Sequence, residues 1–292
     1  MKIGAIEAGG TKFVCGIGNE SGVIEDRIVF PTEHPDKTMK HVLDFFRDKG
    51  VEGIGVGSFG PIGVNPAAED YGTITTTPKS DWSGYPFLQT LRDAFNIRLG
   101  WDTDVNAAAL GEAEWGAAKG LDSCVYYTIG TGVGLGVYAE GRLVHGLVHP
   151  EAGHILPRRH VDDDFAGCCP YHGDCLEGLA SGPSLEQRWG TKARDLPVEH
   201  PAWRIEAYYL GQALIGTILT LSPKKIILGG GVMHQKQLFP FIHAEVVKGL
   251  NGYLYAAEIT DHIERYIVPP QLGSDAGLFG ALALGRRAIE NG

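Results

Sequence analysis

Short runs of apolar residues separated by glycine-rich turns alternate along the chain with longer stretches whose apolar residues recur at helical spacing. Apolar runs bounded by turn residues are typical of buried strands, and recurrence once per helical turn indicates one buried helix face. The runs predict strands at residues 3–6, 13–17, 51–58, 99–102, 125–129, 135–138 and 225–228, with a further strand that ends near residue 30. The spacing predicts helices at residues 37–49, 86–95, 104–119, 201–221 and 278–289.

The predicted strands and helices alternate in both halves of the chain, which indicates an α/β fold. Because the chain has 292 residues, two domains are expected. We predict an N-terminal lobe over residues 1–115 and a C-terminal lobe over residues 116–277, with an alanine-rich helix at their junction. The C-terminal helix, about residues 278–292, is expected to pack back on the N-terminal lobe.

Two glycine-rich turns each connect a pair of predicted strands, and a third glycine cluster follows the strand at 225–228. Each turn alone is also typical of a tight hairpin with no further role. Glycine, however, lets the main chain approach a ligand closely, and exposed N–H groups beside a threonine hydroxyl can hold phosphate oxygens. The clusters together favour a polyphosphate such as ATP held by two lobes, although the P-loop pattern is absent. They contain Gly9, Gly10, Thr11 and Lys12; Thr131 and Gly132; and Gly229, Gly230 and Gly231.

Asp104 stands where a predicted strand meets the start of a helix. An aspartate at this place is often only a helix N-cap that accepts main-chain N–H groups. The alternative is a general base that takes the proton from a substrate hydroxyl during phosphoryl transfer. Because a helix N-terminus stabilises negative charge, we expect it to lower the pKa of Asp104 and keep the carboxylate ionised.

Histidine and cysteine gather within residues 154–175. Two thiolates and two imidazoles suit a closed tetrahedral zinc site, which is structural because no coordination position stays open. We therefore predict a zinc site formed by His154, Cys169, His172 and Cys175. The alternative is a set of buried free cysteines and a surface histidine, and Cys168 leaves open which of two adjacent thiols is the ligand.

Glu151 and Glu177 flank this cluster on its two sides. One interpretation is that they are solvated loop acids. The other is that a zinc-tied loop holds them as acceptors for sugar hydroxyls, because a carboxylate accepts two hydroxyl groups well.

Composition narrows the possible partners and locations. The sequence contains 35 acidic and 25 basic residues, which gives a formal net charge of −10 and argues against nucleic acid as a partner. No apolar run approaches the ~20 residues that span a membrane, and the N-terminus shows no signal-peptide pattern. We therefore expect a cytoplasmic protein without a membrane partner. Three of the 5 cysteines lie within residues 168–175, which favours metal binding over a disulfide framework.

Taken together, these residues resemble the ROK family of sugar kinases, which is part of the actin-like ATPase superfamily. The resemblance covers nearly the whole chain and implies two actin-like (ribonuclease H-like) ATPase lobes with a cleft between them. The motifs that carry it are Ala8-Gly9-Gly10-Thr11-Lys12, the segment from Asp104-Val105-Asn106 to Leu110-Gly111-Glu112, Thr128-Ile129-Gly130-Thr131-Gly132-Val133-Gly134, and Glu151-Ala152-Gly153-His154 with the metal cluster and Glu177.

The resemblance also implies a role for each candidate residue. Asp104 would be the catalytic base, and the two turns and the third glycine cluster would bind ATP, whose phosphates Mg²⁺ would bridge. It further implies a homodimer. The residues that would bind the sugar are Gly60, Pro61, Thr103, Asp104, Glu151, His154 and Glu177, with His154 also on the zinc ion.

Three positions depart from the family pattern. Glu7 stands where many relatives carry aspartate on the magnesium side of the site. A histidine, His172, stands in place of one thiolate of the usual cysteine cluster. Thr103 stands where glucose kinases of the family have asparagine as a sugar contact. The Glu-Ala-Gly-Gly-Thr-Lys start at Glu7 and the Cys-Pro-Tyr-His-Gly-Asp-Cys cluster at Cys169 look like those of the family's bacterial fructokinases.

The resulting prediction is an ATP-dependent hexose kinase, in first place a fructokinase that makes fructose 6-phosphate. Glucose, mannose and amino sugars are the alternative acceptors. A ROK-type transcriptional repressor is one rival, but its helix-turn-helix segment would have no room before the turn at Gly9. A sugar sensor without catalysis is another, and the Asp104 motif argues against it.

Overall fold

The computed structural model describes residues 1–291, which form two compact units. Unit 1 consists of Met1–Asp122, Gly136–Pro150 and the stretch from Gln271 onward, and unit 2 consists of Ser123–Leu135 and Glu151–Pro270. Neither unit is therefore a continuous segment of the chain. The lobe boundary predicted at residues 115 and 116 stays a prediction.

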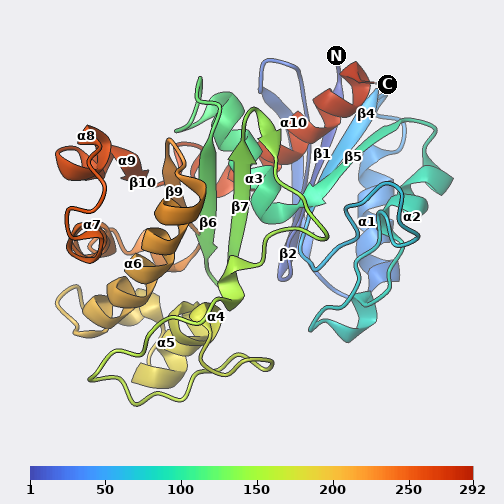
Figure 1. The fold of residues 1–292 in the computed structure, drawn as a ribbon. Helices are drawn as coiled ribbons and strands as arrows, with labels where there is room; N and C mark the ends of the chain where they lie inside the picture. The colour runs from blue at the N-terminus through green and yellow to red at the C-terminus, as the bar shows by residue number, and fades with distance from the viewer. Residues whose placement is uncertain (292) are drawn as a thin grey trace. The chain divides into compact units, whose positions relative to one another are not determined.

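A five-stranded sheet with the order β3-β2-β1-β4-β5 forms the centre of unit 1 (Figure 1). β1 pairs antiparallel with β2, and β2 pairs antiparallel with β3, so the hairpin predicted at the first glycine-rich turn is confirmed. β4 pairs in parallel with both β1 and β5. The strands are β1 (Ile3–Ala8), β2 (Lys12–Gly18), β3 (Ile24–Pro31), β4 (Gly53–Ser58) and β5 (Arg98–Thr103).

Helices cover both faces of this sheet because the side chains of β1 alternate between two apolar clusters. Ile6 belongs to the cluster that includes Met39 of α1 and Leu88 of α2. Ile3 belongs to the opposite cluster, which includes Leu282 of α10. The helices of unit 1 are α1 (Pro35–Phe46), α2 (Phe87–Ala94), α3 (Asp104–Trp115) and α10 (Ala276–Glu290), with short 3-10 turns η1 (Ser80–Trp82) and η5 (Gly273–Asp275).

Helix α3 ends at Trp115, which is earlier than the predicted residue 119. The buried carboxylate of Glu112 accepts the N–H of Ala117 at 2.6 Å, so it holds the chain just beyond the helix in a non-helical path. The same carboxylate accepts the N–H groups of Gln271 and Leu272 at 3.2 and 2.9 Å. Glu112 therefore ties the end of α3 to the segment that leads into α10.

The second sheet has the strand order β10-β9-β6-β7-β8. β9 pairs in parallel with β6 and with β10, and β7 pairs antiparallel with β8. β7 starts in unit 2 and continues into unit 1. The strands are β6 (Cys124–Ile129), β7 (Val133–Ala139), β8 (Arg142–Leu143), β9 (Ile226–Gly229) and β10 (Ile267–Val268).

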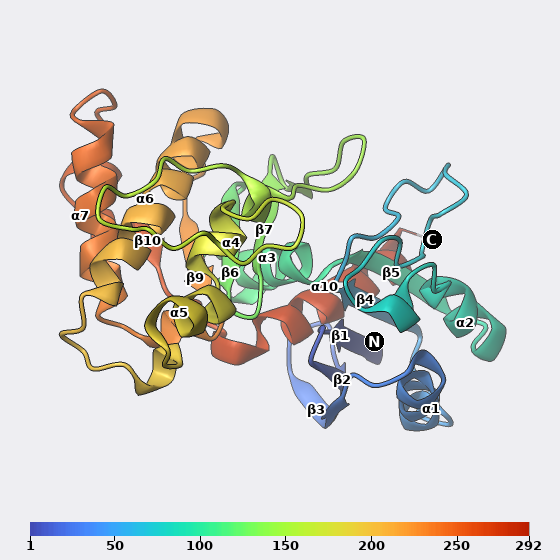
Figure 2. The ribbon, with the colours of Figure 1, turned by 90° about the horizontal axis from the view of Figure 1, so that it is seen from below.

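Unit 2 contains the long helix predicted at residues 201–221, which lies beside α7 (Figure 2). In the described part of the chain, none of the helices combines the length and hydrophobicity needed to span a bilayer. The elements of unit 2 besides its strands are α4 (Leu176–Ala180), α5 (Gly182–Trp189), α6 (Ala202–Leu221), α7 (Leu238–Leu250), α8 (Ala257–Thr260), α9 (Ile263–Tyr266), and the 3-10 turns η2 (Ala152–His154), η3 (Ala193–Asp195) and η4 (Val232–His234).

Candidate functional site

Acidic side chains gather at the carboxyl end of the unit 1 sheet. In the strand register, Gly57 of β4 lies between Glu7 of β1 and Asp102 of β5. Because Gly57 has no side chain, α3 approaches β4 closely: a Cβ atom there would lie 2.6 Å from the Cβ of Ala107 and 3.5 Å from the Cα of Asp104. This close packing holds the start of α3 beside the two strand ends.

Asp104 is the first residue of α3, and Thr103 is its N-cap. The hydroxyl of Thr103 accepts the N–H of Asn106 at 3.1 Å, and Asp104 Oδ1 accepts the N–H of Val105 at 2.8 Å. The interpretation of Asp104 as the N-cap is therefore wrong by one position. Thr103 is 3% exposed and its hydroxyl is committed to the helix.

The predicted direction of the Asp104 pKa is also wrong. Burial of the carboxyl group outweighs the N–H groups that it accepts and raises its pKa to about 6. Burial also raises the pKa of Glu7, to about 7. The charge of Lys12 lowers this pKa, and the charge of Asp104 raises it further. Asp104 is therefore mostly ionised at neutral pH, and the two acids repel each other.

A hydrogen-bonded network that the sequence does not predict surrounds the residues before Asp104. Asp102 Oδ1 accepts the amide of Asn106 and the N–H of Thr103, both at 2.8 Å. Asp102 Oδ2 lies 2.8 Å from His145 Nε2, and Asn106 Oδ1 accepts the N–H of Val137 at 3.0 Å. His145 follows Asp102 by 43 residues, so no local pattern reveals the pair.

The first glycine-rich turn is anchored on the strand beside it and open on its other side. Thr32 donates its hydroxyl to the carbonyl of Gly9 at 2.6 Å and its N–H to the carbonyl of Thr11 at 3.0 Å. A Cβ atom at Gly10 would meet only the Cε of Lys79, at 3.6 Å. The main chain at Gly10 is therefore open on this side apart from Lys79, and phosphate binding by the turn stays a prediction.

Gly60 and Pro61 follow β4 after one intervening residue, and Asp104 follows Thr103, the last residue of β5, which is the parallel neighbour of β4. The carbonyl of Pro61 accepts the N–H of Thr75 at 2.8 Å and its hydroxyl at 3.0 Å. The predicted sugar residues of unit 1 therefore lie at adjacent strand ends. In α/β sheets, ligands commonly bind at such carboxyl ends.

The second turn and the third glycine cluster are neighbours in unit 2. A Cβ atom at Gly130 would lie 3.6 Å from the N atom of Gly231. Gly230 has a φ of +89°, which favours glycine. The predicted nucleotide residues Thr131 and Gly132 thus come together with Gly229, Gly230 and Gly231 in this unit.

The main chain of Val133 connects the two candidate sugar acids of unit 2. Glu177 Oε2 accepts the N–H of Val133 at 3.0 Å. Gly153 packs against the carbonyl of Val133 so closely that a Cβ atom has no room. Because Gly153 lies between Glu151 and His154, the start of β7 positions the Glu151 segment and Glu177 together.

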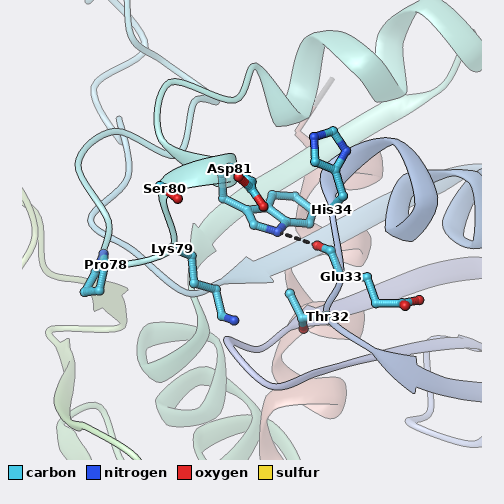
Figure 3. A pocket seen from close by; sticks show the side chains of 8 residues that line it. Thr32, Glu33, His34, Pro78, Lys79, Ser80 and Asp81 are labelled. Atoms are coloured by element: carbon cyan, nitrogen blue, oxygen red, sulfur yellow. Dashed lines mark hydrogen bonds between the residues drawn. The ribbon is translucent and has the colours of Figure 1, made fainter.

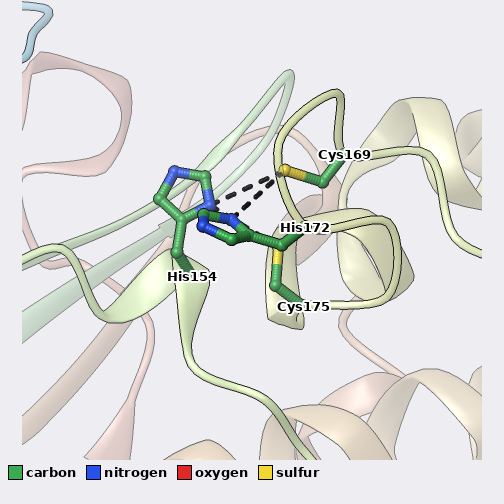
Figure 4. Close-up of side chains that lie close together, drawn as sticks. All are labelled: His154, Cys169, His172 and Cys175. Carbon is green, nitrogen blue, oxygen red and sulfur yellow. Dashed lines mark hydrogen bonds between the residues drawn. The ribbon is translucent and has the colours of Figure 1, made fainter.

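His154, Cys169, His172 and Cys175 point toward one another (Figure 4). Their four candidate ligand atoms all lie within 4.8 Å of one another, and Nδ1 of His154 is 3.8 Å from Sγ of Cys169 and 3.5 Å from Sγ of Cys175. Tetrahedral zinc with ordinary bond lengths separates nitrogen and sulfur ligands by about 3.6 Å. The predicted set therefore fits one metal ion, and Cys168 lies outside it.

Comparison with known proteins gives matches over the length of the chain. A sequence model of the ROK family matches residues 3–288. A protein of Bacillus subtilis (strain 168) with a provisional fructokinase name is 57% identical over 99% of this chain and 96% of its own length. A fructokinase of Pediococcus pentosaceus is 49% identical over 100% of both chains. The solved structure of a ROK hexokinase from Thermus thermophilus has a TM-score of 0.81 at 25% identity, over 100% of both chains.

Proposed function

The chain belongs to the ROK family, and we propose that it is an ATP-dependent fructokinase that converts D-fructose and ATP into D-fructose 6-phosphate and ADP. The expected α/β fold with two actin-like ATPase lobes is confirmed by the family match and by the likeness to the ROK hexokinase. Fructose is supported as the acceptor because the relatives at 57% and 49% identity carry fructokinase names. Glucose, mannose and amino sugars are the alternative acceptors.

The observation that best supports the kinase chemistry is the buried carboxylate of Asp104 at the start of α3. With a pKa of about 6, its carboxylate is mostly ionised at neutral pH and can accept a proton. The oxygen of the fructose 6-hydroxyl forms a bond to the γ-phosphorus while the bond from that phosphorus to the bridging oxygen breaks. The hydroxyl proton passes to Asp104, and ADP leaves with the electron pair of the broken bond.

The residues proposed for ATP lie in both units. In unit 1, the open main chain at Gly10 suits phosphate oxygens. In unit 2, the neighbouring glycine clusters suit the remaining parts of the nucleotide. When bound with ATP, Mg²⁺ would neutralise phosphate charge, and Glu7 is the acid at the end of β1 that suits a water-mediated contact to it.

For the sugar, we propose one group of residues in each unit. The unit 1 group stands at the ends of β4 and β5, and the unit 2 group is positioned around Val133. The Thr103 hydroxyl caps α3. We propose that threonine at this position removes the sugar contact that the longer asparagine carboxamide makes in glucose kinases of the family. The two groups are Gly60, Pro61, Thr103 and Asp104, and Glu151, His154 and Glu177.

Zinc is the metal that we propose for the Cys/His cluster. Two sulfur and two nitrogen ligands at tetrahedral separations are the donor set of a closed zinc site. Burial raises the pKa of the Cys175 thiol, and a bound cation would stabilise the thiolate there. Bound zinc would fix the loop between His154 and Cys175, which carries no chemistry in the transfer itself. The homodimer and the cytoplasmic location stay predictions.

The initial rate of ADP release with Mg-ATP and a panel of hexoses tests the proposal. We expect fructose to give the highest kcat/KM among fructose, glucose, mannose and glucosamine. ADP release that no hexose stimulates would instead favour the sugar sensor without catalysis. A preference for another hexose would keep the kinase and replace the acceptor.

A further inference from the structure

A cavity of about 290 Å³ lies in unit 1 against the strand end that anchors the first glycine-rich turn. Thr32 lines it and is hydrogen-bonded to the carbonyl groups of Gly9 and Thr11 in that turn. The opposite wall is the segment 78–82, which contains Lys79 and Trp82 (Figure 3). The cavity thus lies between the strand end that anchors the proposed phosphate-binding turn and the loop segment 78–82.

This loop is held in place at both of its ends. The indole N–H of Trp82 donates to the carbonyl of Glu33 at 2.9 Å, and the side chain is 1% exposed. At the other end, Thr75 donates twice to the carbonyl of Pro61. Lys79 therefore stands on a fixed segment between the proposed sugar residue Pro61 and the first turn.

The amine of Lys79 is a cation without a structural partner. Its side chain extends toward Thr32, and its Cε lies 3.6 Å from where a Cβ atom of Gly10 would be (Figure 3). Among the described residues, no hydrogen bond or ion pair involves this amine. Glu33, an acid of the same cavity, is 2.6 Å from the amine of Lys37.

We propose that Lys79 binds the terminal phosphoryl group of ATP and stabilises its charge during transfer. This inference rests on the proposed kinase function and adds a contact that its motifs do not contain. The phosphoryl group passes from the nucleotide to the sugar hydroxyl, so it must lie between the phosphate turn at Gly10 and the base Asp104. Lys79 approaches this place from the loop whose residue Thr75 is hydrogen-bonded to the proposed sugar residue Pro61.

A lysine suits this task because negative charge spreads over the three equatorial oxygens as the bond to the bridging oxygen breaks. Lys79 takes no part in the proton transfer, because the hydroxyl proton goes to Asp104. Lys12, in the turn itself, is a second cation near this place, and its charge lowers the pKa of Glu7. Lys79 adds a cation from a separate segment, and no hydrogen bond or ion pair of its amine is found among the described residues.

The test compares Lys79→Met and Lys79→Arg with Lys119→Met, which removes an exposed lysine beyond the end of α3. With saturating fructose, we expect Lys79→Met to lower kcat by roughly 10²-fold, the effect of losing one preorganised charge contact. Lys79→Arg keeps the charge and should recover most of that loss. Lys119→Met should match the wild type.

Binding of AMPPNP and ADP in the presence of Mg²⁺, measured by calorimetry, provides a readout that does not depend on the sugar. Lys79→Met should weaken AMPPNP by roughly tenfold, the size of one hydrogen bond to a charged group, and leave ADP within about twofold. A ratio of AMPPNP to ADP affinity equal to that of the wild type overturns the role of Lys79. Absence of wild-type activity with every hexose, together with a changed ratio, rejects the proposed function and keeps the phosphate contact.

Discussion

His145 Nε2 lies 2.8 Å from Oδ2 of the buried Asp102, and this ion pair connects the segment before the Glu151 motif to the end of β5. Asp102 also accepts the N–H of Thr103, the residue before the proposed base. The hydrogen bond to Asp102 raises the pKa of His145, although its side chain is 35% exposed. The pair therefore links Asp102, two residues before Asp104, to a histidine on another segment.

We expect His145→Gln to remove a pH-dependent part of the stability. Because folding raises the pKa of His145, the ion pair stabilises the fold fully below the unfolded pKa of ~6.5. Its contribution is lost as the pH rises through the folded-state pKa. The Tm of the wild type should exceed that of the variant most at about pH 6 and least at about pH 9. Of the other polar groups near the ring, Asn106 carries no charge, and burial lowers the pKa of His149. An equal Tm difference at both pH values would contradict this role.

Asp104→Asn keeps the shape of the side chain and removes its basicity. We expect kcat to fall by roughly 10²–10⁴, the usual range for a lost general base, with KM for fructose nearly unchanged. The wild-type kcat/KM should also decrease as the pH falls below about 6, because protonated Asp104 cannot accept the hydroxyl proton. The assignment is wrong if the variant keeps more than about a tenth of the wild-type kcat.

Gly10→Ala tests the first turn without disturbing the fold. The added methyl group would meet only the flexible end of Lys79 at an ordinary contact distance of 3.6 Å, so the folded protein accommodates it. It would, however, occupy the space where a phosphate approaches the main chain. We expect KM for ATP to rise by roughly tenfold or more, as for one lost charge-assisted contact.

Gly216→Ala is the matched control, because a Cβ atom at that position of α6 has no neighbour within 4 Å. Gly132→Val is a weaker test of the turns, because its Cβ would lie 2.6 Å from Glu177 Oε2 and would disturb a proposed sugar residue. If Gly10→Ala and Gly216→Ala show the same KM for ATP, the first turn does not bind phosphate.

Metal analysis should return about one zinc per chain, as one site with four ligands requires. Cys175→Ala should lose the metal, because its Sγ belongs to the group of four ligand atoms. Cys168→Ala should keep it, since this thiol lies outside the group. Loss of zinc from Cys168→Ala together with retention in Cys169→Ala would reverse the choice between the two adjacent cysteines.

Thr103→Asn should narrow the preference for fructose over glucose. We expect the wild type to favour fructose in kcat/KM by at least tenfold, about 1.4 kcal/mol of transition-state discrimination. Asparagine is as good an N-cap as threonine, so α3 keeps its cap while the longer carboxamide becomes available to the sugar. A wild-type kcat/KM for glucose equal to that for fructose would rule out the fructokinase and leave the kinase.

Much of the fold can be predicted because it depends on the spacing of apolar and turn residues over short stretches of sequence. The hairpin around Gly9 and the long helix at residues 201–221 follow from short-range spacing, and both are observed. The end of α3 is not predictable in this way. It depends on the carboxylate of Glu112, whose partners include Gln271, 159 residues away.

In the candidate site, too, some features follow from neighbouring residues in the sequence and others depend on distant segments. The motif around Asp104 and the cluster around Cys169 are visible as sequence spacings, and the structure brings each cluster together. The direction of the Asp104 pKa is not visible, because burial by distant segments outweighs the helix N-terminus that a local reading suggests. Lys79 is hidden for a similar reason, since only the folded loop brings it to Gly10.

The place of α10 in unit 1 has a consequence for the chain while it is still on the ribosome. Translation delivers β1 to β5 first, and α10 follows only after the residues of unit 2. Until then, the apolar face of Ile3, Ala5 and Val14 lacks Leu278 and Leu282, which cover it in the finished protein. At ordinary elongation rates, synthesis of residues 123–270 takes roughly seven to thirty seconds. For that time this apolar face of the sheet is not covered by α10, so chaperones that bind exposed apolar surface can reach it in the nascent chain.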